Sequence, residues 1–318
     1  MSDAHLTATA GRGTSAVRAW AAAARLPFTS VAVVPFGAGA YLAWANGAAT
    51  SVLVPALGIV AVFLICVGCY LTGEVYDQRE DVATLEHGRT PFSGGSLMVA
   101  NGTLSRRAVL GAAIGAFGLA AGLGIAIFAL RRDPLLLGLG AFGLAVAAVY
   151  SAPPVRLVSR GFGELFIGVC YGWLTLATGY ACAAGALPRD SAAFSVPVAL
   201  TVFNIILINE FPDYEADRGA GKRNLLVRVG RGAGSWIYAA ATAGTAASIL
   251  WIWHRFAAGS GAKLAVALAV AGLALGLGAA VVVFRRWRDN RAIQPVCGLT
   301  IVLNLLSAVA VGALVRWP

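Results

Sequence analysis

Two acidic segments of the chain share the pattern Glu-x-x-Asp-x-x-x-Asp. Each holds three carboxylates at positions i, i+3 and i+7, which lie on one face of an α-helix and are expected to project together. These residues are Glu74, Asp77 and Asp81 in the first segment and Glu210, Asp213 and Asp217 in the second. Carboxylates crowded on one face repel each other, so each segment predicts a site for a cation.

A hard divalent cation suits such a donor set. Mg²⁺ takes oxygen ligands, usually keeps one or two carboxylates, and completes its shell with water and substrate phosphates. We therefore expect the four aspartates to be essential for catalysis and the two glutamates to serve as further metal ligands. Two such clusters on one side of the molecule would hold two metal ions with a diphosphate between them.

Basic residues follow each acidic segment. Arg89 comes after the first, together with the segment Thr90–Ser96, whose Ser-Gly-Gly-Ser turn lets backbone N–H groups approach an anion closely. Lys222 and Arg223 come after the second. Lys and Arg side chains bind phosphate oxygens directly. We therefore expect Arg89, Lys222 and Arg223 to bind the diphosphate.

Three charged residues lie off the shared faces, and we expect them to be solvated: Arg79, Glu80 and Glu215. Of these, Glu80 and Glu215 are expected to be dispensable for activity. The alternative interpretation of both segments is a pair of solvated loops at the edge of a membrane. A single motif would favour that alternative. Two matching copies, each followed by basic residues on the same side, favour a metal–diphosphate site.

Composition places these motifs in a membrane protein. Of the 318 residues, 59% are hydrophobic and 12% are charged, with a mean hydropathy of +0.78, whereas soluble domains carry about 25% charged residues. A spanning helix needs roughly 20 mostly apolar residues, and nine segments satisfy this. They cover residues 26–46, 51–73, 108–130, 134–152, 162–184, 191–209, 233–253, 263–284 and 293–315.

The predicted fold class is therefore all-α: a polytopic membrane bundle of about nine transmembrane helices with two cytoplasmic capping loops, 73–107 and 210–232. Residues 1–24 are expected to form a flexible cytoplasmic tail, and residues 25–318 a single transmembrane domain. The glycine pairs Gly111/Gly115 and Gly272/Gly276 have the small-x-x-x-small spacing that packs helices in lipid. The five cysteines lie in apolar spans and are expected to be small core residues.

The net charge of +10 does not indicate nucleic-acid binding. Most Lys and Arg residues fall in the tail and in alternate connections, as expected when those connections face the cytoplasm. This bias predicts an integral protein of a bacterial inner membrane, with the N-terminus and both acidic loops on the cytoplasmic side.

At these residues the chain resembles the UbiA superfamily of intramembrane prenyltransferases. The resemblance rests on the segment Asn209–Asp217, the following Gly-Lys-Arg at 221–223, the first acidic loop, and the Tyr-Ser-Ala-Pro-Pro-Val-Arg turn at 150–156. The second motif is most similar to the branch that prenylates 1,4-dihydroxy-2-naphthoate in menaquinone synthesis.

This resemblance implies a helix bundle around a lipid-open cavity, Mg²⁺ held by the aspartates and Asn209, and an isoprenoid chain running into the bundle. It also implies that Arg25, Tyr150 and Arg156 lie near the acceptor or the diphosphate. The family usually has Asn where this chain has Gly73, so either one ligand is absent or Glu74 replaces it.

The expected activity is Mg²⁺-dependent transfer of a prenyl group from a prenyl diphosphate to an aromatic acceptor, in quinone synthesis. A terpene cyclase of the same superfamily, or transfer to a non-aromatic acceptor, fits the same motifs. A transporter would need ionisable residues near mid-membrane, and the spans hold almost none.

Overall fold

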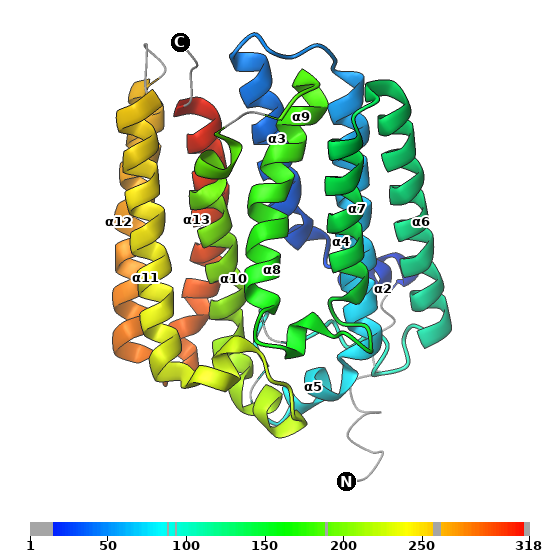
Figure 1. Ribbon diagram of the computed structural model, residues 1–318. Helices are drawn as coiled ribbons and strands as arrows, with labels where there is room; N and C mark the ends of the chain where they lie inside the picture. Colours follow the sequence, from blue (N-terminus) through cyan, green and yellow to red (C-terminus); the bar gives the residue numbers. More distant parts are fainter. Residues whose placement is uncertain (1–14, 88, 93, 188–189, 257–261, 315–318) are drawn as a thin grey trace.

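The computed structural model describes residues 15–314, apart from 88, 93, 188–189 and 257–261. In these residues every regular element is helical (Figure 1). The elements are α2 (Ala16–Ala23), η1 (Leu26–Thr29), α3 (Ser30–Ala45), α4 (Leu53–Tyr76), α5 (Gln78–Ala83), α6 (Arg106–Arg131), α7 (Pro134–Val149), η2 (Leu157–Ser159), α8 (Gly163–Ile167), the π-helical η3 (Gly168–Leu174), α9 (Thr175–Ala184), α10 (Ser191–Ala220), α11 (Leu225–Phe256), α12 (Ala262–Arg286) and α13 (Asn290–Leu314).

The predicted membrane bundle is confirmed. Eight helical segments in the described chain are long and apolar enough to cross a membrane, and the remaining expected span, 134–152, contains the shorter apolar helix α7. Helix α7 begins sharply because Asp133 accepts hydrogen bonds from the N–H groups of Leu135 and Leu136, with Pro134 at the first helical position. The eight long apolar helices make the chain an integral membrane protein.

Part of the expected N-terminal tail is ordered, which corrects the prediction for that stretch. Residues 16–23 form helix α2, which begins at Ser15 and buries Ala19 and Ala23 against the neighbouring helices. The prediction missed this helix because its apolar face consists mainly of alanine. The expectation for residues 1–14 lies outside the described residues.

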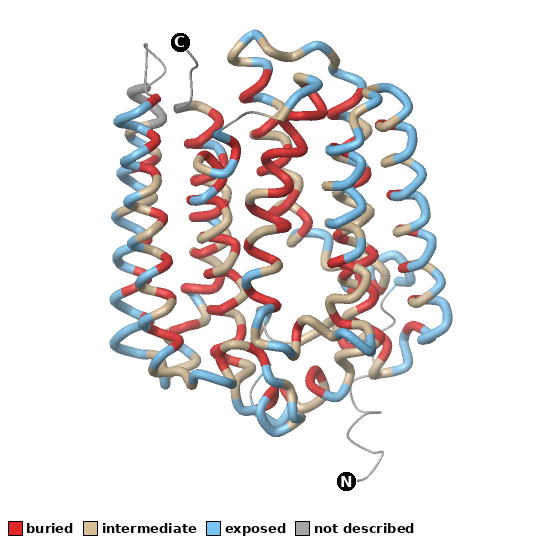
Figure 2. Tube along the Cα trace, viewed as in Figure 1, coloured by how far each residue is buried: buried red, intermediate tan, exposed pale blue. Residues whose placement is uncertain are grey.

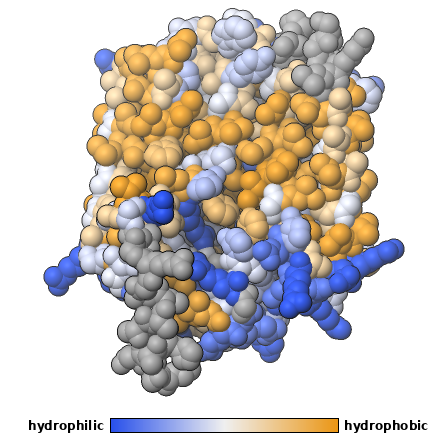
Figure 3. Space-filling view, turned by 180° about the vertical axis from the view of Figure 1, so that it is seen from behind, coloured by the Kyte–Doolittle hydropathy of each residue, from blue (hydrophilic) through white to orange (hydrophobic). Residues whose placement is uncertain are grey.

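The surface of the bundle matches the two solvents that it meets. Buried residues line the inner faces of α3, α9, α10 and α13, whereas α6, α11 and α12 expose much of their length (Figure 2). On the face shown in Figure 3, apolar residues form a broad band and hydrophilic residues gather at the lower end. Exposed apolar side chains are expected where lipid rather than water is the neighbour.

Both acidic segments lie at this lower end (Figure 1), but their backbones differ. Helix α4 ends at Tyr76, and Asp77 separates it from the short helix α5. Helix α10 instead continues through its motif, although Pro212 has no N–H to donate to the carbonyl oxygen of Ile208. The thiol of Cys297 donates to that oxygen at 3.7 Å, which gives one of the five buried cysteines a role beyond packing.

Glycines set the closest helix contact near the centre of the bundle. A Cβ at Gly39 of α3 would lie 2.0 Å from the carbonyl oxygen of Leu176, and a Cβ at Gly179 of α9 would lie 2.0 Å from that of Phe36. The predicted packing role of Gly111, Gly115 and Gly272 is wrong, because a Cβ there would meet nothing within 4 Å. A Cβ at Gly276 would lie 3.3 Å from the Thr242 side chain, a close contact between helices.

Substitution of the two central glycines tests this packing. Gly39→Ala and Gly179→Ala should each destabilise the protein by about 1–3 kcal/mol, because backbone atoms must move apart to admit the methyl group. Gly111→Ala is the matched control and should be neutral or stabilising by up to about 1 kcal/mol, because alanine favours the helix. Thermal unfolding in detergent measures both effects. An unchanged melting temperature for Gly179→Ala would contradict the contact.

Candidate active site

A polar cavity of about 190 Å³ lies between the two acidic segments. Helices α4, α5 and α10 contribute carboxylates to its wall, and the loop after α5 and the connection before α11 complete it. Most of the predicted site residues line it, namely Arg25, Glu74, Asp77, Asp81, Tyr150, Asn209, Glu210, Asp213, Asp217 and Lys222. Three predicted residues do not: Arg89, Arg156 and Arg223.

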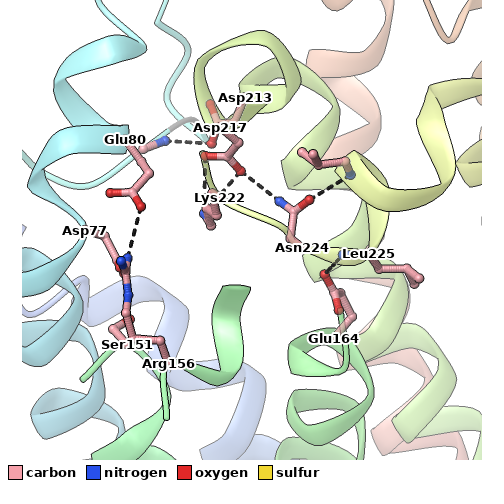
Figure 4. Close-up of polar contacts among 12 residues, drawn as sticks. Asp77, Glu80, Ser151, Arg156, Glu164, Asp213, Asp217, Lys222, Asn224 and Leu225 are labelled. Carbon is pink, nitrogen blue, oxygen red and sulfur yellow. Dashed lines mark hydrogen bonds and ion pairs between the residues drawn. The ribbon is translucent and has the colours of Figure 1, made fainter. Parts of the chain in front are cut away.

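Asp77 is held by two residues from the turn that follows α7 (Figure 4). The hydroxyl of Ser151 donates to its Oδ2 at 2.6 Å, and Nη2 of Arg156 donates to its Oδ1 at 3.0 Å. The same nitrogen of Arg156 lies 3.0 Å from Oε1 of Glu80. Arg156 therefore sits between two carboxylates and fixes the break between α4 and α5, rather than lining the cavity.

The expectation for Glu80 is wrong. Glu80 is 4% exposed and paired with Arg156, whereas Arg79 and Glu215 are exposed as expected. The prediction assumed one continuous helix through the first motif. Because the helix breaks at Asp77, α5 turns Glu80 inward toward Arg156.

Glu74 also has a different role from the expected one. Its Oε2 accepts a hydrogen bond from the N–H of Ser96 at 2.9 Å, and its Oε1 accepts from Val99 at 3.4 Å. Both oxygens of this buried carboxylate therefore hold the backbone of the loop after α5. We do not retain Glu74 as a metal ligand.

The same loop joins the two acidic segments directly. The N–H of Gly94 donates to Oδ2 of Asp213 at 2.9 Å, and a Cβ at Gly95 would lie 2.1 Å from Oδ2 of Asp81. A side chain at Gly95 would collide with Asp81, and Gly94 adopts a positive φ of 58°, so the loop needs glycine at both positions. Arg89 supports the loop, since its Nη2 donates to the carbonyl oxygen of Gly95 at 2.7 Å. Ser93 of the predicted turn lies outside the described residues.

The second segment ends in a second set of tethers (Figure 4). Nζ of Lys222 lies 3.1 Å from Oδ2 of Asp217, and Nδ2 of Asn224 donates to the same oxygen at 2.8 Å. Lys222 can turn back toward α10 because Gly221 ends that helix with a positive φ of 83°. Arg223, two residues further, is exposed on the outside.

A buried glutamate that the sequence left ambiguous supports this turn. Glu164 of α8 is 1% exposed, and its Oε1 accepts a hydrogen bond from the N–H of Leu225 at 2.7 Å, where α11 begins. A single acidic residue in an apolar span is costly unless it has a partner. The position of Glu164 in such a span was therefore the sequence feature that could have indicated its role.

The electrostatics of the cavity favour a bound cation. Burial raises the pKa of Asp77 and raises that of Asp81 to about 7, because low polarity disfavours the charged carboxylate. Arg25 opposes this shift at Asp81. Burial would lower the pKa of Lys222, but Asp217, Asp77 and other carboxylates raise it well above its usual value. Lys222 thus stays charged, but Lys222 and Arg25 are only two basic groups in a cavity lined by six acidic side chains.

The residues present fit Mg²⁺. The buried Oδ1 of Asn209 has no hydrogen-bond partner and belongs to a residue that lines the cavity. With the four aspartates it offers the hard oxygen donors that Mg²⁺ prefers. In the described chain no group of three or more His, Cys, Asp or Glu side chains is arranged to hold a metal ion by itself. Mg²⁺ would be held by Asp77 and Asp81 on one side and by Asn209, Asp213 and Asp217 on the other.

The departure at Gly73 has a structural explanation. A Cβ at Gly73 would lie 3.5 Å from Oδ2 of Asp77 and 3.6 Å from the hydroxyl oxygen of Ser151. A side chain at position 73 would therefore begin beside Asp77 and the Ser151 hydroxyl that donates to it. The Ser151 hydroxyl, rather than Glu74, is the neighbouring polar group that contacts Asp77 here.

A second, apolar cavity of about 290 Å³ adjoins the first. Its wall comes from α3, α4, α6, α7 and the segment α8–α9. Cys69, Ile167 and Tyr171 line both cavities and mark their junction. The arrangement can therefore hold an amphipathic molecule, with its anionic end among the aspartates and its apolar end inside the bundle.

Comparison with known families agrees with this division. The model of the UbiA prenyltransferase family matches residues 32–307. The chain belongs to this family. The predicted resemblance is thereby confirmed. The match covers both acidic segments and the whole lining of the apolar cavity, whereas Arg25 of the polar cavity precedes it.

The individual relatives of this UbiA family member share less than a third of its residues over the matched segments. The chain is 29% identical over 160 residues to the 1,4-dihydroxy-2-naphthoate octaprenyltransferase of Bacillus subtilis, a match that spans 50% of each chain. It is 29% identical over 226 residues to the 2-carboxy-1,4-naphthoquinone phytyltransferase of Synechocystis, covering 69% of this chain and 68% of the relative.

A solved structure of a UbiA homologue from Archaeoglobus fulgidus, bound to DMAPP and Mg²⁺, shares the fold. Its TM-score is 0.67 at 18% identity, covering 92% of this chain and 98% of that one. At this identity the likeness concerns the fold.

Charge removal at the aspartates tests the site. Asp77→Asn, Asp81→Asn, Asp213→Asn and Asp217→Asn should each lower turnover with a prenyl diphosphate by at least about a hundredfold, because each loses a metal-binding charge. Glu215→Gln on the exposed face of α10 is the matched control and should retain activity. Thermal unfolding checks that each variant is folded. A folded Asp213→Asn variant with normal turnover would refute the assignment.

The Arg156 tether makes a separate prediction. Glu80→Gln should lower turnover about tenfold, equivalent to about 1.4 kcal/mol, because Arg156 loses one of the two charges that hold it beside Asp77. The conservative variant Glu80→Asp should recover part of this loss, and Glu215→Gln again serves as the control. Equal turnover in Glu80→Gln and the unaltered protein would mean that the buried pair does not position Asp77.

Proposed function

We propose that this protein transfers a prenyl group from a prenyl diphosphate to an aromatic acceptor, in a Mg²⁺-dependent reaction within the membrane. The observation that carries the proposal is the junction between the acidic cavity and the apolar cavity. A prenyl diphosphate has one end for each. Membership of a prenyltransferase family supports the same reaction.

The diphosphate end would lie among the aspartates, Asn209 and Lys222. When bound there, Mg²⁺ would neutralise the diphosphate and stabilise the charge that develops on it as it leaves. Lys222 contributes a fixed positive charge from the other side, already aligned by Asp217 and Asn224. Of the three predicted diphosphate ligands, Lys222 is therefore the one we retain inside the cavity. Arg89 would act through the loop that it supports.

The allylic carbon becomes electron-poor as its bond to oxygen lengthens, and the junction suits this change. Tyr70 and Tyr171 line the polar cavity, and Tyr171 also lines the apolar one. Aromatic faces attract positive charge. The hydroxyl of Tyr70 donates to the carbonyl oxygen of Phe28 at 3.2 Å, which fixes the ring. The apolar wall beyond excludes water, which would otherwise capture the cation.

Arg25 is the best candidate to bind the acceptor. It lines the cavity, and no carboxylate in the described chain forms an ion pair with it, whereas Arg156 is engaged by Asp77 and Glu80. A free guanidinium binds a carboxylate through charge-assisted hydrogen bonds. Tyr150 lines the same cavity and can contact an aromatic ring. These residues suit an aromatic carboxylic acid, and dihydroxynaphthoate is the acceptor we propose.

The distribution of charge supports an orientation with both acidic segments in the cytoplasm of a bacterium. Arginines concentrate at the end of the bundle that holds the acidic cavity, in connections such as 218–231 and 285–291. Positive charge favours the inner side of a membrane. A water-soluble acceptor and Mg²⁺ would reach the cavity from that side.

Product analysis tests the function. The purified protein should convert prenyl diphosphate and 1,4-dihydroxy-2-naphthoate to a prenylated naphthalene derivative, identified by mass spectrometry. EDTA should abolish product, because the carboxylates then repel the diphosphate, and excess Mg²⁺ should restore it. Arg25→Gln should raise the KM for the acceptor more than that for the donor. Full activity in chelator would sink the metal site, and a cyclised hydrocarbon formed without acceptor would replace transfer with cyclisation.

A further inference from the structure

A third hollow, of about 590 Å³, shares Lys222 with the acidic cavity. It is lined by the end of α10 and the start of α11, and all of its charged lining residues are cations. They are Arg218, Lys222, Arg223 and Arg228. Glu215, one turn before Arg218 on α10, is exposed and does not line the hollow.

The three arginines have no acidic partner. In the described chain none of Arg218, Arg223 and Arg228 forms an ion pair. Arg228 is nevertheless held in place, because its Nε donates to the carbonyl oxygen of Arg223 at 2.7 Å. Its side chain also crosses Gly161, where a Cβ would lie 2.5 Å from Cδ of Arg228. Unpaired guanidinium groups around one hollow favour a multivalent anion.

Lys222 connects this hollow to the active cavity, since it lines both. Its ammonium group contacts Asp217 on the inner side, and Gly221, which sets the turn, lines the hollow on the outer side. An anion that leaves the aspartates past Lys222 would next meet the three arginines.

Resting on the proposed function, we propose that the hollow formed by Arg218, Arg223 and Arg228 is a second anion site, which receives inorganic diphosphate as it leaves the active cavity for water. The two products differ in solubility, so they need different exits. The prenylated product leaves through lipid. The diphosphate is highly charged and needs a polar route, and this hollow adjoins the lysine that holds it during the reaction.

Calorimetry can separate this site from the active cavity. Without Mg²⁺ the aspartates repel diphosphate, whereas the arginine hollow needs no metal. Inorganic diphosphate titrated into the full-length protein, in uncharged detergent with EDTA, should therefore bind at the hollow. Arg218→Gln and Arg228→Gln should each weaken this binding about two- to fivefold, the range for exposed charge pairs. Arg107→Gln, on exposed α6, is the matched control and should bind normally.

A kinetic arm tests the role in release. With Mg²⁺, added inorganic diphosphate should inhibit Arg218→Gln and Arg228→Gln less than the unaltered protein, while their single-turnover transfer rates stay unchanged. Equal binding and equal inhibition in all variants would overturn the proposal. If no prenyl transfer is found while the calorimetric site persists, the proposed function fails and the release role fails with it.

The same chemistry could recognise the phosphate of an anionic lipid, and a lipid arm distinguishes the two. The protein in nanodiscs of phosphatidylcholine should bind diphosphate as it does in detergent, and phosphatidylglycerol should compete only weakly. Retention of phosphatidylglycerol through purification, lost in Arg218→Gln and accompanied by no diphosphate binding, would make the hollow a lipid headgroup site and overturn its assignment to diphosphate.

Discussion

Repulsion among buried carboxylates is the constraint on which the lower half of this bundle depends. Four aspartates share one cavity of low polarity, where their charged forms are disfavoured. The fold holds three of them with one or two tethers each: Arg156 and Ser151 on Asp77, Gly94 on Asp213, and Lys222 and Asn224 on Asp217. These tethers leave the cavity acidic, so the proposed binding of a cation would relieve the repulsion that remains.

The tethers also explain why the site needs residues far from the motifs. Glu164 lies on α8, yet it fixes the N–H of Leu225 and so sets where α11 begins after the Lys222 turn. Ser151 and Arg156 belong to the turn after α7, yet they determine the position of Asp77. Three connections at one end of the bundle are thus interlocked through charged groups, while the helices above them pack through apolar contacts. The rigid helices of the apolar band can then hold these connections in one geometry.

The sequence predicted the bundle well because lipid imposes a simple rule, namely about 20 apolar residues for each span. It predicted the second acidic segment better than the first for a physical reason. Helix α10 runs unbroken through Asn209–Asp217, so helical spacing describes its carboxylates. Helix α4 stops at Tyr76, and the break turns Glu80 inward to meet Arg156. That pairing joins positions far apart in the chain, and neither periodicity nor a local motif carries information about it.

The resemblance to the UbiA family predicted which positions belong to the site, but not which residues each of them contacts. Arg25 and Arg156 were expected in the same role, and both are arginines at the inner end of a span. Only the structure separates them: Arg156 is held between Asp77 and Glu80, whereas Arg25 enters the cavity from the left-handed turn before η1. The same logic applies to Lys222 and Arg223, which are adjacent in sequence but face the inside and the outside of the site. Because Gly221 reverses the chain just before them, Lys222 faces the aspartates while Arg223 belongs to a separate basic surface, so an acidic interior lies beside a basic outer face.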